Sequence, residues 1–325
     1  MLTTQSKSIR IVETSRPAGG RMTGFLQEIR KNRVLYAMFL PVALYFLVFA
    51  YKPMAGIVVA FKSFNYRQGI FGSPWCGLDN FRFFFTSGKA LSVTLNTVGY
   101  NLVFLICYTV FSILVAIMIA EMSGRFMKKL TQSLMFLPYF MSWVVVAAFM
   151  YNFCNYEYGL VNSLLKAMKL APVDIYSMPT AWYFLLPFLY VWKWIGYGSV
   201  LYLAAIMGID QECYEAAMID GASIFQRIRH VTLPALRPTM VILILMGLGT
   251  VMRGQFDMFY QLIGNNGMLL EKTDIIDTLV FRSLMGSSDF GMAASAGAYQ
   301  SLLCFVIIMV ANALVRRIEK DYALF

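Results

Sequence analysis

Long apolar stretches alternate with short polar ones along the whole chain. Six of the apolar runs are long enough to cross a bilayer, because a helix rises 1.5 Å per residue and the hydrocarbon layer is roughly 30 Å thick. The first run, residues 34–51, carries no charge and is followed by an amphipathic extension over 54–61. The other five runs lie at about 91–120, 131–151, 181–208, 239–263 and 291–315. The pattern predicts an all-α, polytopic membrane protein with six transmembrane helices.

The polar segments between these runs predict the loops. Residues 62–89 hold glycines and charges among aromatic residues, which is typical of an ordered loop anchored at the membrane interface by Trp75 and Phe81. Residues 152–179 include leucines that share one helical face, which predicts a short interfacial helix. Pro138 predicts a kink in the third run.

Composition and charge agree with this picture. With 59% hydrophobic residues and a mean hydropathy of +0.64, the 325-residue chain has more apolar surface than one soluble core can bury. The net charge of +10 does not indicate nucleic acid, because excess lysine and arginine in a membrane protein marks cytoplasmic loops. The termini and even-numbered connections carry 16 lysines and arginines against 8 on the opposite side, which predicts that both termini are cytoplasmic.

These boundaries divide the chain into five parts. They are a basic cytoplasmic tail (1–33), a first transmembrane helix with its extension (34–61), an external loop (62–89), a core domain (90–315) that contains a cytoplasmic loop (208–238), and a cytoplasmic C-terminal tail (316–325).

The sequence gives little support to metal chemistry or catalysis. The five cysteines occur singly and are expected to be free thiols, although Cys76 and Cys154 are predicted to lie on the same side of the membrane. His230 is the only histidine, so no metal site is expected. The chain lacks G-x-x-x-x-G-K-[ST], G-x-S-x-G and H-E-x-x-H, so we expect a non-catalytic protein that does not itself hydrolyse ATP.

The longest charged and patterned segment between two apolar runs is 211–234. Acidic residues precede Gly221 and basic residues follow it. This arrangement predicts two short helices of opposite charge, joined at a glycine that adopts a left-handed conformation.

This segment carries a resemblance to a known family. The residues Glu215-Ala216-Ala217, then Gly221 after three positions, and Val231-x-Leu233-Pro234 after nine more, resemble the motif EAA-x3-G-x9-I-x-LP. That motif is typical of the permease subunits of binding-protein-dependent ABC importers, and the one departure is valine for isoleucine. The short segments 77–81, 96–97, 159–162 and 256–257 are similar to the carbohydrate-uptake branch, especially the larger maltose-type and oligosaccharide permeases.

The resemblance implies a type I importer-like fold in which the hairpin couples the permease to a separate ATPase. The coupling residues would be Glu215, Ala216, Ala217, Gly221, Leu233 and Pro234. The alanines keep one helix face thin, and the Glu215 carboxylate offers a charge-assisted contact. Ile224, Phe225 and Ile228 are expected to form an apolar stripe on the second helix, which Pro234 and Pro238 should end.

The resemblance also implies the assembly and its location. The partners would be a second permease in a heterodimer, a cytoplasmic ATPase dimer, an extracytoplasmic sugar-binding protein, a carbohydrate substrate and membrane lipid, with no nucleic acid. The chain itself would bind no cofactor, while ATP and Mg²⁺ would belong to the partner ATPase. The location would be the bacterial cytoplasmic membrane.

Polar and aromatic side chains inside the spans are candidates for the substrate path, because burying them is costly. They are Asn101, Lys193, Trp194, Tyr197, Arg253, Asp257 and Tyr260. Aromatic faces suit sugar C–H surfaces, while amide and charged groups suit hydroxyls. The alternatives are that Arg253 and Asp257 form an ion pair, that Lys193 contacts the neighbouring permease, and that the tryptophans are interfacial anchors.

Other functions stay open at this point. The charged segment is also consistent with an amphipathic helix lying on lipid headgroups. The transported solute need not be a sugar. A membrane-embedded enzyme that modifies glycans or lipids would use Asp257 or the acidic stretch 271–277. A secondary transporter working alone is disfavoured, because the hairpin would then have no partner.

Overall fold

The computed structural model describes residues 28, 30–86 and 88–318. Within these residues the structure is helical, and the only β-type pairing is an isolated bridge between Lys62 and Trp75. The predicted all-α class is therefore confirmed. Five helices are long and apolar enough to cross a membrane, and a sixth crossing results when one sharply bent helix pair is counted as a single span. The chain separates into two compact units, residues 1–56 and 57–325.

The described part of unit 1 forms one apolar helical run. The helix α2 (Arg33–Phe46) continues through a π-helical turn, η1 (Leu47–Tyr51), into α3 (Lys52–Met54). The 3-10 segment η2 (Ala55–Phe61) completes a candidate span of 29 residues. A helix long and apolar enough to cross a membrane covers the predicted first span and its extension, whereas most of the predicted basic tail lies outside the described residues.

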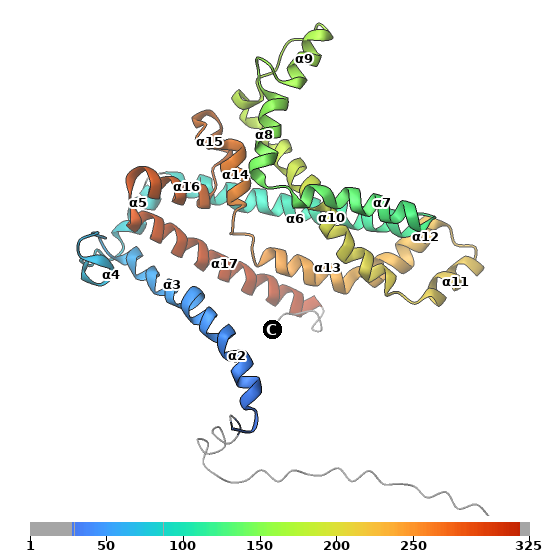
Figure 1. Cartoon of the computed structure of the whole chain (residues 1–325), viewed down its shortest axis with the longest axis horizontal. Coiled ribbons are helices and arrows are strands. Elements are labelled where there is room, and N and C mark those ends of the chain that lie inside the picture. The colour runs from blue at the N-terminus through green and yellow to red at the C-terminus, as the bar shows by residue number, and fades with distance from the viewer. Residues whose placement is uncertain (1–27, 29, 87, 319–325) are drawn as a thin grey trace, which may run out of the picture. The chain divides into compact units, whose positions relative to one another are not determined.

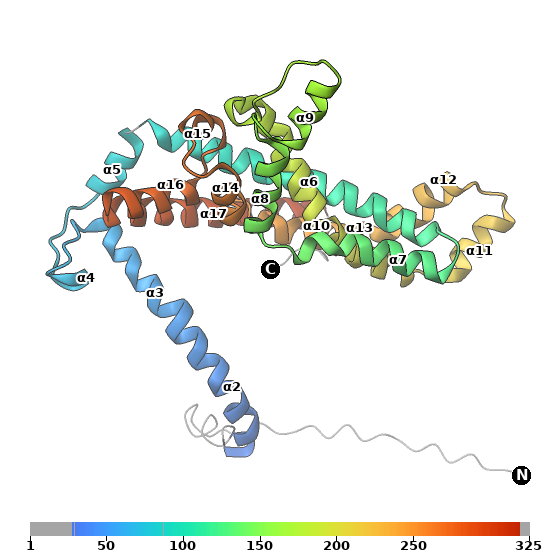
Figure 2. The ribbon, with the colours of Figure 1, turned by 45° about the horizontal axis from the view of Figure 1, so that its top comes forward.

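Unit 2 is organised around four long helical runs, which Figures 1 and 2 show from two directions. The runs are α6 (Lys89–Glu121), α10 (Trp182–Met207), α17 (Phe290–Ile318), and a continuous helix made of α12 (Ile224–Arg227), the π-helical turn η6 (Ile228–Thr232) and α13 (Leu233–Leu248). The helix α13 contacts α6, α10 and α17.

Short elements connect these runs. They are α4 (Gly69–Gly72), α5 (Asp79–Thr86), α9 (Leu160–Ala167), η4 (Ile175–Ser177), η5 (Pro179–Ala181), α15 (Gly267–Thr273), α16 (Ile276–Arg282) and η7 (Ser283–Ser287). The short helix predicted within 152–179 is α9. All five cysteines are free thiols, as expected, so Cys76 and Cys154 do not pair.

The third predicted span is broken at almost a right angle. Its first arm consists of α7 (Arg125–Phe136) and η3 (Leu137–Phe140), and its second arm, α8 (Trp143–Cys154), is turned by 94°. Pro138 lies in η3, and Ser142 caps α8 by accepting a backbone hydrogen bond from its first turn at 3.4 Å. At Pro138 the helix tightens into the 3-10 turn η3, and the sharp change of direction falls just after this turn.

The fifth predicted span, residues 239–263, is wrong at both ends. The helix begins at Ile224, inside the charged segment, and ends at Leu248. Residues 249–255 are turns and irregular backbone, after which α14 (Phe256–Ile263) forms a separate helix. The irregular stretch contains Arg253, a charged residue that was predicted to lie inside the span.

The expectation that Pro234 and Pro238 end the hairpin helix is also wrong. The π-helical turn η6 directly precedes Pro234 and interrupts the regular α-helical hydrogen-bond pattern, so the continuous helix accommodates a residue without an N–H at this point. Pro238 is accommodated inside α13. The second hairpin helix and the fifth span are therefore one continuous element.

Two glycines let α10 pack closely between α6 and α7. A Cβ atom at Gly198 would collide with the Ser112 hydroxyl of α6, and a Cβ atom at Gly196 would collide with the Met135 carbonyl group of α7. Backbones approach this closely only where the side chain is absent. The position of α10 is thereby fixed against both neighbours.

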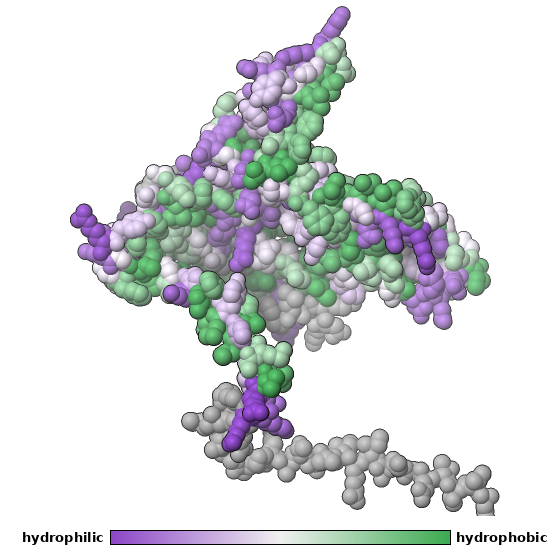
Figure 3. Space-filling model, in the orientation of Figure 1, coloured by the Kyte–Doolittle hydropathy of each residue, from purple (hydrophilic) through white to green (hydrophobic). Residues whose placement is uncertain are grey.

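The buried core is divided along the unit. One cluster, which includes Trp182, Phe104 and Phe259, joins α10, α6 and α14. Another, which includes Tyr202 and Leu236, joins α10 and α13 near the charged segment. Figure 3 shows hydrophilic residues gathered at this end of unit 2 and hydrophobic residues over much of α7.

Candidate functional site

The charged segment after α10 forms a helical hairpin. Its first helix, α11 (Gln211–Ile219), begins at Asp210, whose Oδ1 accepts a backbone N–H of the first turn at 3.0 Å. Gly221 follows with φ of +76°, a left-handed conformation that favours glycine. The backbone N–H of Ser223 donates to Gln226 Oε1 at 2.7 Å in a capping box that starts α12. The predicted hairpin, joined at a left-handed glycine, is confirmed.

The outer face of this hairpin is apolar and carries one carboxylate. Glu215 and Ala216 are exposed, and Glu215 makes no hydrogen bond or ion pair with the described residues. Ile219 is 86% exposed and Phe225 is 81% exposed. Ile219 lies outside the candidate spans, and Phe225 lies at the very start of one. Large apolar side chains that are this exposed at such positions are typical of a protein interface.

Part of the predicted apolar stripe faces inward. Ile228 packs against the buried cluster of Ala116 and Tyr202, as does Leu233, while Pro234 is exposed. The outer face of the second helix is therefore formed by Ile224 and Phe225 without Ile228. Sequence periodicity predicted the face, but the π-helical turn at Ile228 shifts the register.

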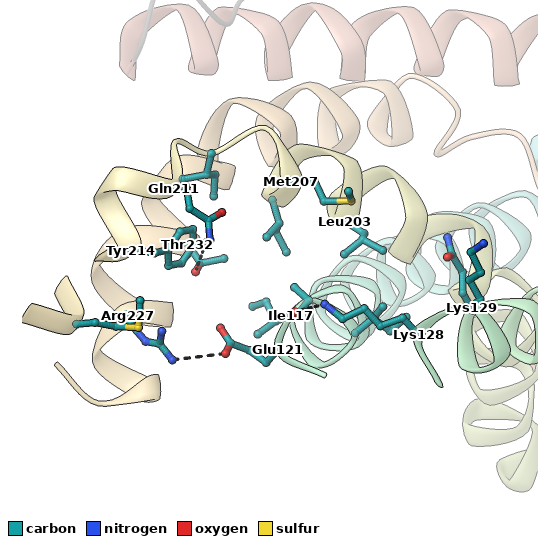
Figure 4. Close-up of a pocket in the computed structure, with 16 residues that line it drawn as sticks. Ile117, Glu121, Lys128, Lys129, Leu203, Met207, Gln211, Tyr214, Arg227 and Thr232 are labelled. Carbon is teal, nitrogen blue, oxygen red and sulfur yellow. Dashed lines mark hydrogen bonds and ion pairs between the residues drawn. The ribbon is translucent and has the colours of Figure 1, made fainter. Parts of the chain in front are cut away.

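One polar contact closes the hairpin, and another joins it to α6. The hydroxyl groups of Tyr214 and Thr232 lie 2.9 Å apart and connect α11 to η6. Arg227 Nη2 lies 3.6 Å from Glu121 Oε2 at the end of α6. Figure 4 shows both contacts beside a cavity of about 460 Å³, which separates α11 from the ends of α6 and α10.

A second cavity, of about 830 Å³, lies where two breaks meet. One break is the right-angled turn between η3 and α8, and the other is the irregular segment before α14. The cavity is lined by Tyr139, Phe140, Met141, Ser142, Trp143, Val144, Lys193, Trp194, Gly254, Gln255, Phe256, Asp257 and Gln261. Non-helical backbone of this kind is tolerated at membrane depth where it lines a cavity.

The chemistry of this lining is aromatic and polar. Trp194 lines the cavity, and its indole Nε1 is buried without a hydrogen-bond partner among the described residues. Gln255 and Gln261 add amide groups, and Asp257 adds an exposed carboxylate. Such a surface can stack on apolar faces of a ligand while hydrogen-bonding its hydroxyl groups.

The structure brings together three of the predicted path residues in this cavity, which are Lys193, Trp194 and Asp257. Tyr197 stacks on Tyr139, one of the lining residues, with ring centroids 5.3 Å apart. Asp257 and Arg253 do not form the ion pair considered as an alternative, because the ion pairs of the described residues lie elsewhere.

The other predicted path residues lie outside the cavity. Asn101 donates its amide to the Thr97 carbonyl of its own helix at 2.8 Å. Tyr260 packs between aromatic rings of α14 and α16, with its centroid 4.9 Å from that of Phe281. Arg253 lies in the irregular segment before α14. Their role in the substrate path stays a prediction from the sequence.

Several lining residues were not predicted from the sequence. Tyr139, Trp143, Gln255 and Gln261 reach the cavity because the two helices are broken there. The proline at 138 was the available signal for the first break. For the second break, the available signal in the sequence was the pair of glycines at positions 249 and 254.

Asp277 holds the second break in place. Its Oδ2 accepts the Gly254 N–H at 2.5 Å, and its Oδ1 accepts from Gln300 Nε2 at 2.9 Å. Gln300 also donates to the Met252 carbonyl group, and Cys304 Sγ lies 3.0 Å from the Gly249 carbonyl oxygen. Burial raises the pKa of the Asp277 carboxyl. The hydrogen bonds from Gln300 and Gly254 and the charge of Arg253 act in the opposite direction.

A comparison with known families decides what this architecture is. Residues 112–320 match the family model described as "Binding-protein-dependent transport system inner membrane component". The chain belongs to this family. As a permease of this kind, it is a multi-pass membrane component of a transport system and not an enzyme. Among the residues that the structure describes, no group of three or more His, Cys, Asp or Glu side chains could hold a metal ion.

Individual permeases match over most of the chain. The polygalacturonan/rhamnogalacturonan transport system permease protein YteP of Bacillus subtilis is 31% identical over 297 residues, covering 91% of this permease and 92% of that protein. The trehalose/maltose transport system permease protein MalF of Thermococcus litoralis is 28% identical over 285 residues, covering 87% and 92%.

The fold also matches a solved transporter. A crystal structure of a bacterial ABC transporter that imports the acidic polysaccharide alginate contains a chain that is 32% identical, with a TM-score of 0.83, covering 91% of this permease and 99% of that chain. The predicted ABC importer-type permease fold is therefore confirmed.

Proposed function

We propose that this permease is one transmembrane subunit of an ATP-driven importer of carbohydrates, with oligosaccharides as its cargo. The observation that carries the proposal is the aromatic and amide-lined cavity of about 830 Å³ at the two helix breaks. Its volume lies within the range of small-molecule sites, and its chemistry suits a sugar. Relatives named for polygalacturonan, maltose and alginate transport support the same class of cargo.

In this proposal the hairpin couples cargo movement to a separate ATPase. Glu215, Ala216 and Gly221 form the exposed docking element, and Phe225 enters an apolar cleft of the ATPase. Ala217, Leu233 and Pro234 support it, and Leu233 does so by packing against the core. Because α12 is continuous with α13, a push on the docked hairpin moves the fifth span as well.

The assembly follows from the family and from the chain's own chemistry. We infer a heterodimer with a second permease, a cytoplasmic ATPase dimer that binds ATP and Mg²⁺, and an extracytoplasmic sugar-binding protein. One matched structure is of an alginate transporter in complex with its alginate pentasaccharide-bound periplasmic protein. Both termini and the hairpin would lie in the cytoplasm of a bacterium, in agreement with the charge bias of the loops.

Within the cavity, Trp194 and Asp257 would contact the sugar. The free Nε1 donor of Trp194 would bind a hydroxyl oxygen, and its ring would stack on the sugar face. The Asp257 carboxylate would accept hydroxyl hydrogen bonds, joined by Gln255 and Gln261. Tyr197 would support this wall through its stacking on Tyr139.

The coupling assignment is tested with Glu215→Lys and Gly221→Asp. Both variants should insert in the membrane at normal levels, but should lose co-purification of the ATPase and lose carbohydrate uptake. Glu271→Lys is the matched control, because Glu271 is a similarly exposed carboxylate that lies outside the hairpin, in α15. Normal ATPase recovery and uptake by both hairpin variants would remove the assignment.

A further inference from the structure

Lys193 is held by backbone groups and is not free in the cavity. It is 5% exposed, in the middle of α10. Its Nζ donates to the carbonyl oxygens of Pro138 at 3.3 Å and Tyr139 at 3.1 Å, and to that of Met141. The same Nζ lies 5.4 Å from the centre of the Trp143 ring.

These acceptors belong to the right-angled break between η3 and α8. Carbonyl groups at the end of a helix lack N–H partners within the helix and carry the negative end of the helix dipole. Of the three acceptors, the Pro138 carbonyl also accepts the Met141 N–H at 3.1 Å. An ammonium group has three donors, and here three carbonyl groups take them. Lys193 can therefore give a hydrogen bond to a cargo hydroxyl only by releasing a carbonyl group of the break.

The helix that carries Lys193 leads directly to the hairpin. The helix α10 ends at Met207, and Asp210 already caps α11. Lys193 lies 14 positions before Met207, or about 21 Å along the helix axis. One turn from Lys193, Gly196 packs directly on the Met135 carbonyl group of α7. A movement of the hairpin that shifts α10 is therefore passed to the region of the break by two adjoining contacts, those of Lys193 and Gly196.

We propose that Lys193 is a positioning residue that transmits hairpin movement through α10 to the cavity wall, and that it is not a ligand of the cargo. The inference rests on the proposed function. In this proposal, a change in the angle of the break moves the cavity wall formed by residues 139–144, and Lys193 links this wall to α10.

The test uses the complete importer, purified through a tag on this permease and reconstituted in proteoliposomes. Lys193→Met keeps the length of the side chain and removes the ammonium donors. We expect uptake per ATP hydrolysed to fall by at least about tenfold, which is the effect of losing a single hydrogen bond from a charged donor, because this variant loses three. The cargo concentration at half-maximal uptake should stay within about twofold.

A second variant disturbs the neighbouring contact between α10 and α7 without altering Lys193. Gly196→Ala places a methyl group against the Met135 carbonyl group and pushes α10 away from the break, although Gly196 does not line the cavity. It should show the same loss of uptake per ATP. Trp194→Phe removes the indole N–H and part of the aromatic ring from a residue that lines the cavity, so it should raise the half-maximal concentration and leave uptake per ATP unchanged.

The outcomes separate the possibilities. Absence of carbohydrate uptake by the wild-type importer would refute the proposed function itself. With an active wild type, a raised half-maximal concentration and normal uptake per ATP in Lys193→Met would show that Lys193 is a ligand and overturn the inference. If Lys193→Met does not assemble, normal uptake per ATP in Gly196→Ala would overturn it as well.

Discussion

The exposed phenylalanine of the coupling hairpin gives a quantitative test of docking. Phe225 is 81% exposed, so truncating it in Phe225→Ala removes almost no contact within the permease. We expect the free energy of unfolding to change by less than about 0.5 kcal/mol. The effect should appear only when the ATPase binds.

The expected loss follows from the exposed fraction. Complete burial of a phenylalanine side chain contributes roughly 1.5–3 kcal/mol. Because 81% of Phe225 is available for burial, docking should lose about 1.2–2.4 kcal/mol in the variant, which weakens the Kd by roughly 8-fold to 60-fold.

The assay is a titration of purified ATPase onto the detergent-solubilised permease pair, followed by light scattering or a fluorescent label on the ATPase. Phe71→Ala is the matched control, because Phe71 is 89% exposed but lies in α4, far along the chain from the hairpin. An unchanged Kd in Phe225→Ala, or an equal loss in Phe71→Ala, would refute the assignment of this face to the ATPase.

Three further predictions concern the hairpin and the second break. A Cβ atom at Gly221 would meet no atom within 4 Å, so the only cost of Gly221→Ala is its left-handed backbone, which should destabilise the docking conformation of the hairpin by about 1 kcal/mol. Gly221→Asn should destabilise this conformation clearly less. Equal ATPase affinities for the two variants would contradict this prediction. The partly exposed Arg227–Glu121 pair should contribute at most about 1 kcal/mol, so Glu121→Gln should lower the thermal midpoint by no more than about 4 °C. Because burial raises the pKa of the Asp277 carboxyl, the folded state binds this proton more tightly than the unfolded chain; stability from this group should therefore be greatest at acidic pH and be lost as the pH rises through the folded pKa. Asp277→Asn should remove this part of the pH dependence in thermal melts, and an unchanged slope would count against the raised pKa.

The hairpin was predictable because its signals are local. The charge change and the glycine at its centre act within a few positions of each other, and the structure places the left-handed Gly221 between two helices as expected. The spans of α6, α10 and α17 were predictable for a similar reason, since hydropathy over one helix is enough to define them.

The second break was not predictable, because the groups that hold it are distant in the sequence. Residues 249–255 directly follow an apolar run, and the backbone leaves the helix there. Its N–H and carbonyl groups are taken by Asp277 and Gln300, which lie 23 and 48 positions away from the residues they bind. Tertiary hydrogen bonds of this kind override helix propensity without leaving a local pattern.

Lys193 shows the same limit for site prediction. An ionisable residue inside a span indicates a functional site, and Lys193 does line the cavity. The sequence could not show that its donors are used by three carbonyl groups at a break more than 50 positions earlier in the chain. The residue type was informative, but its role depends on tertiary contacts.

Uptake by the reconstituted importer tests the central claim most directly. Proteoliposomes that contain the complex purified through this permease should accumulate labelled oligosaccharide when ATP and the sugar-binding protein are supplied on their respective sides, and should do so after ion gradients have been collapsed. Uptake that persists without ATP and disappears with the ion gradient would contradict the account, because the hairpin would then couple the permease to no ATPase.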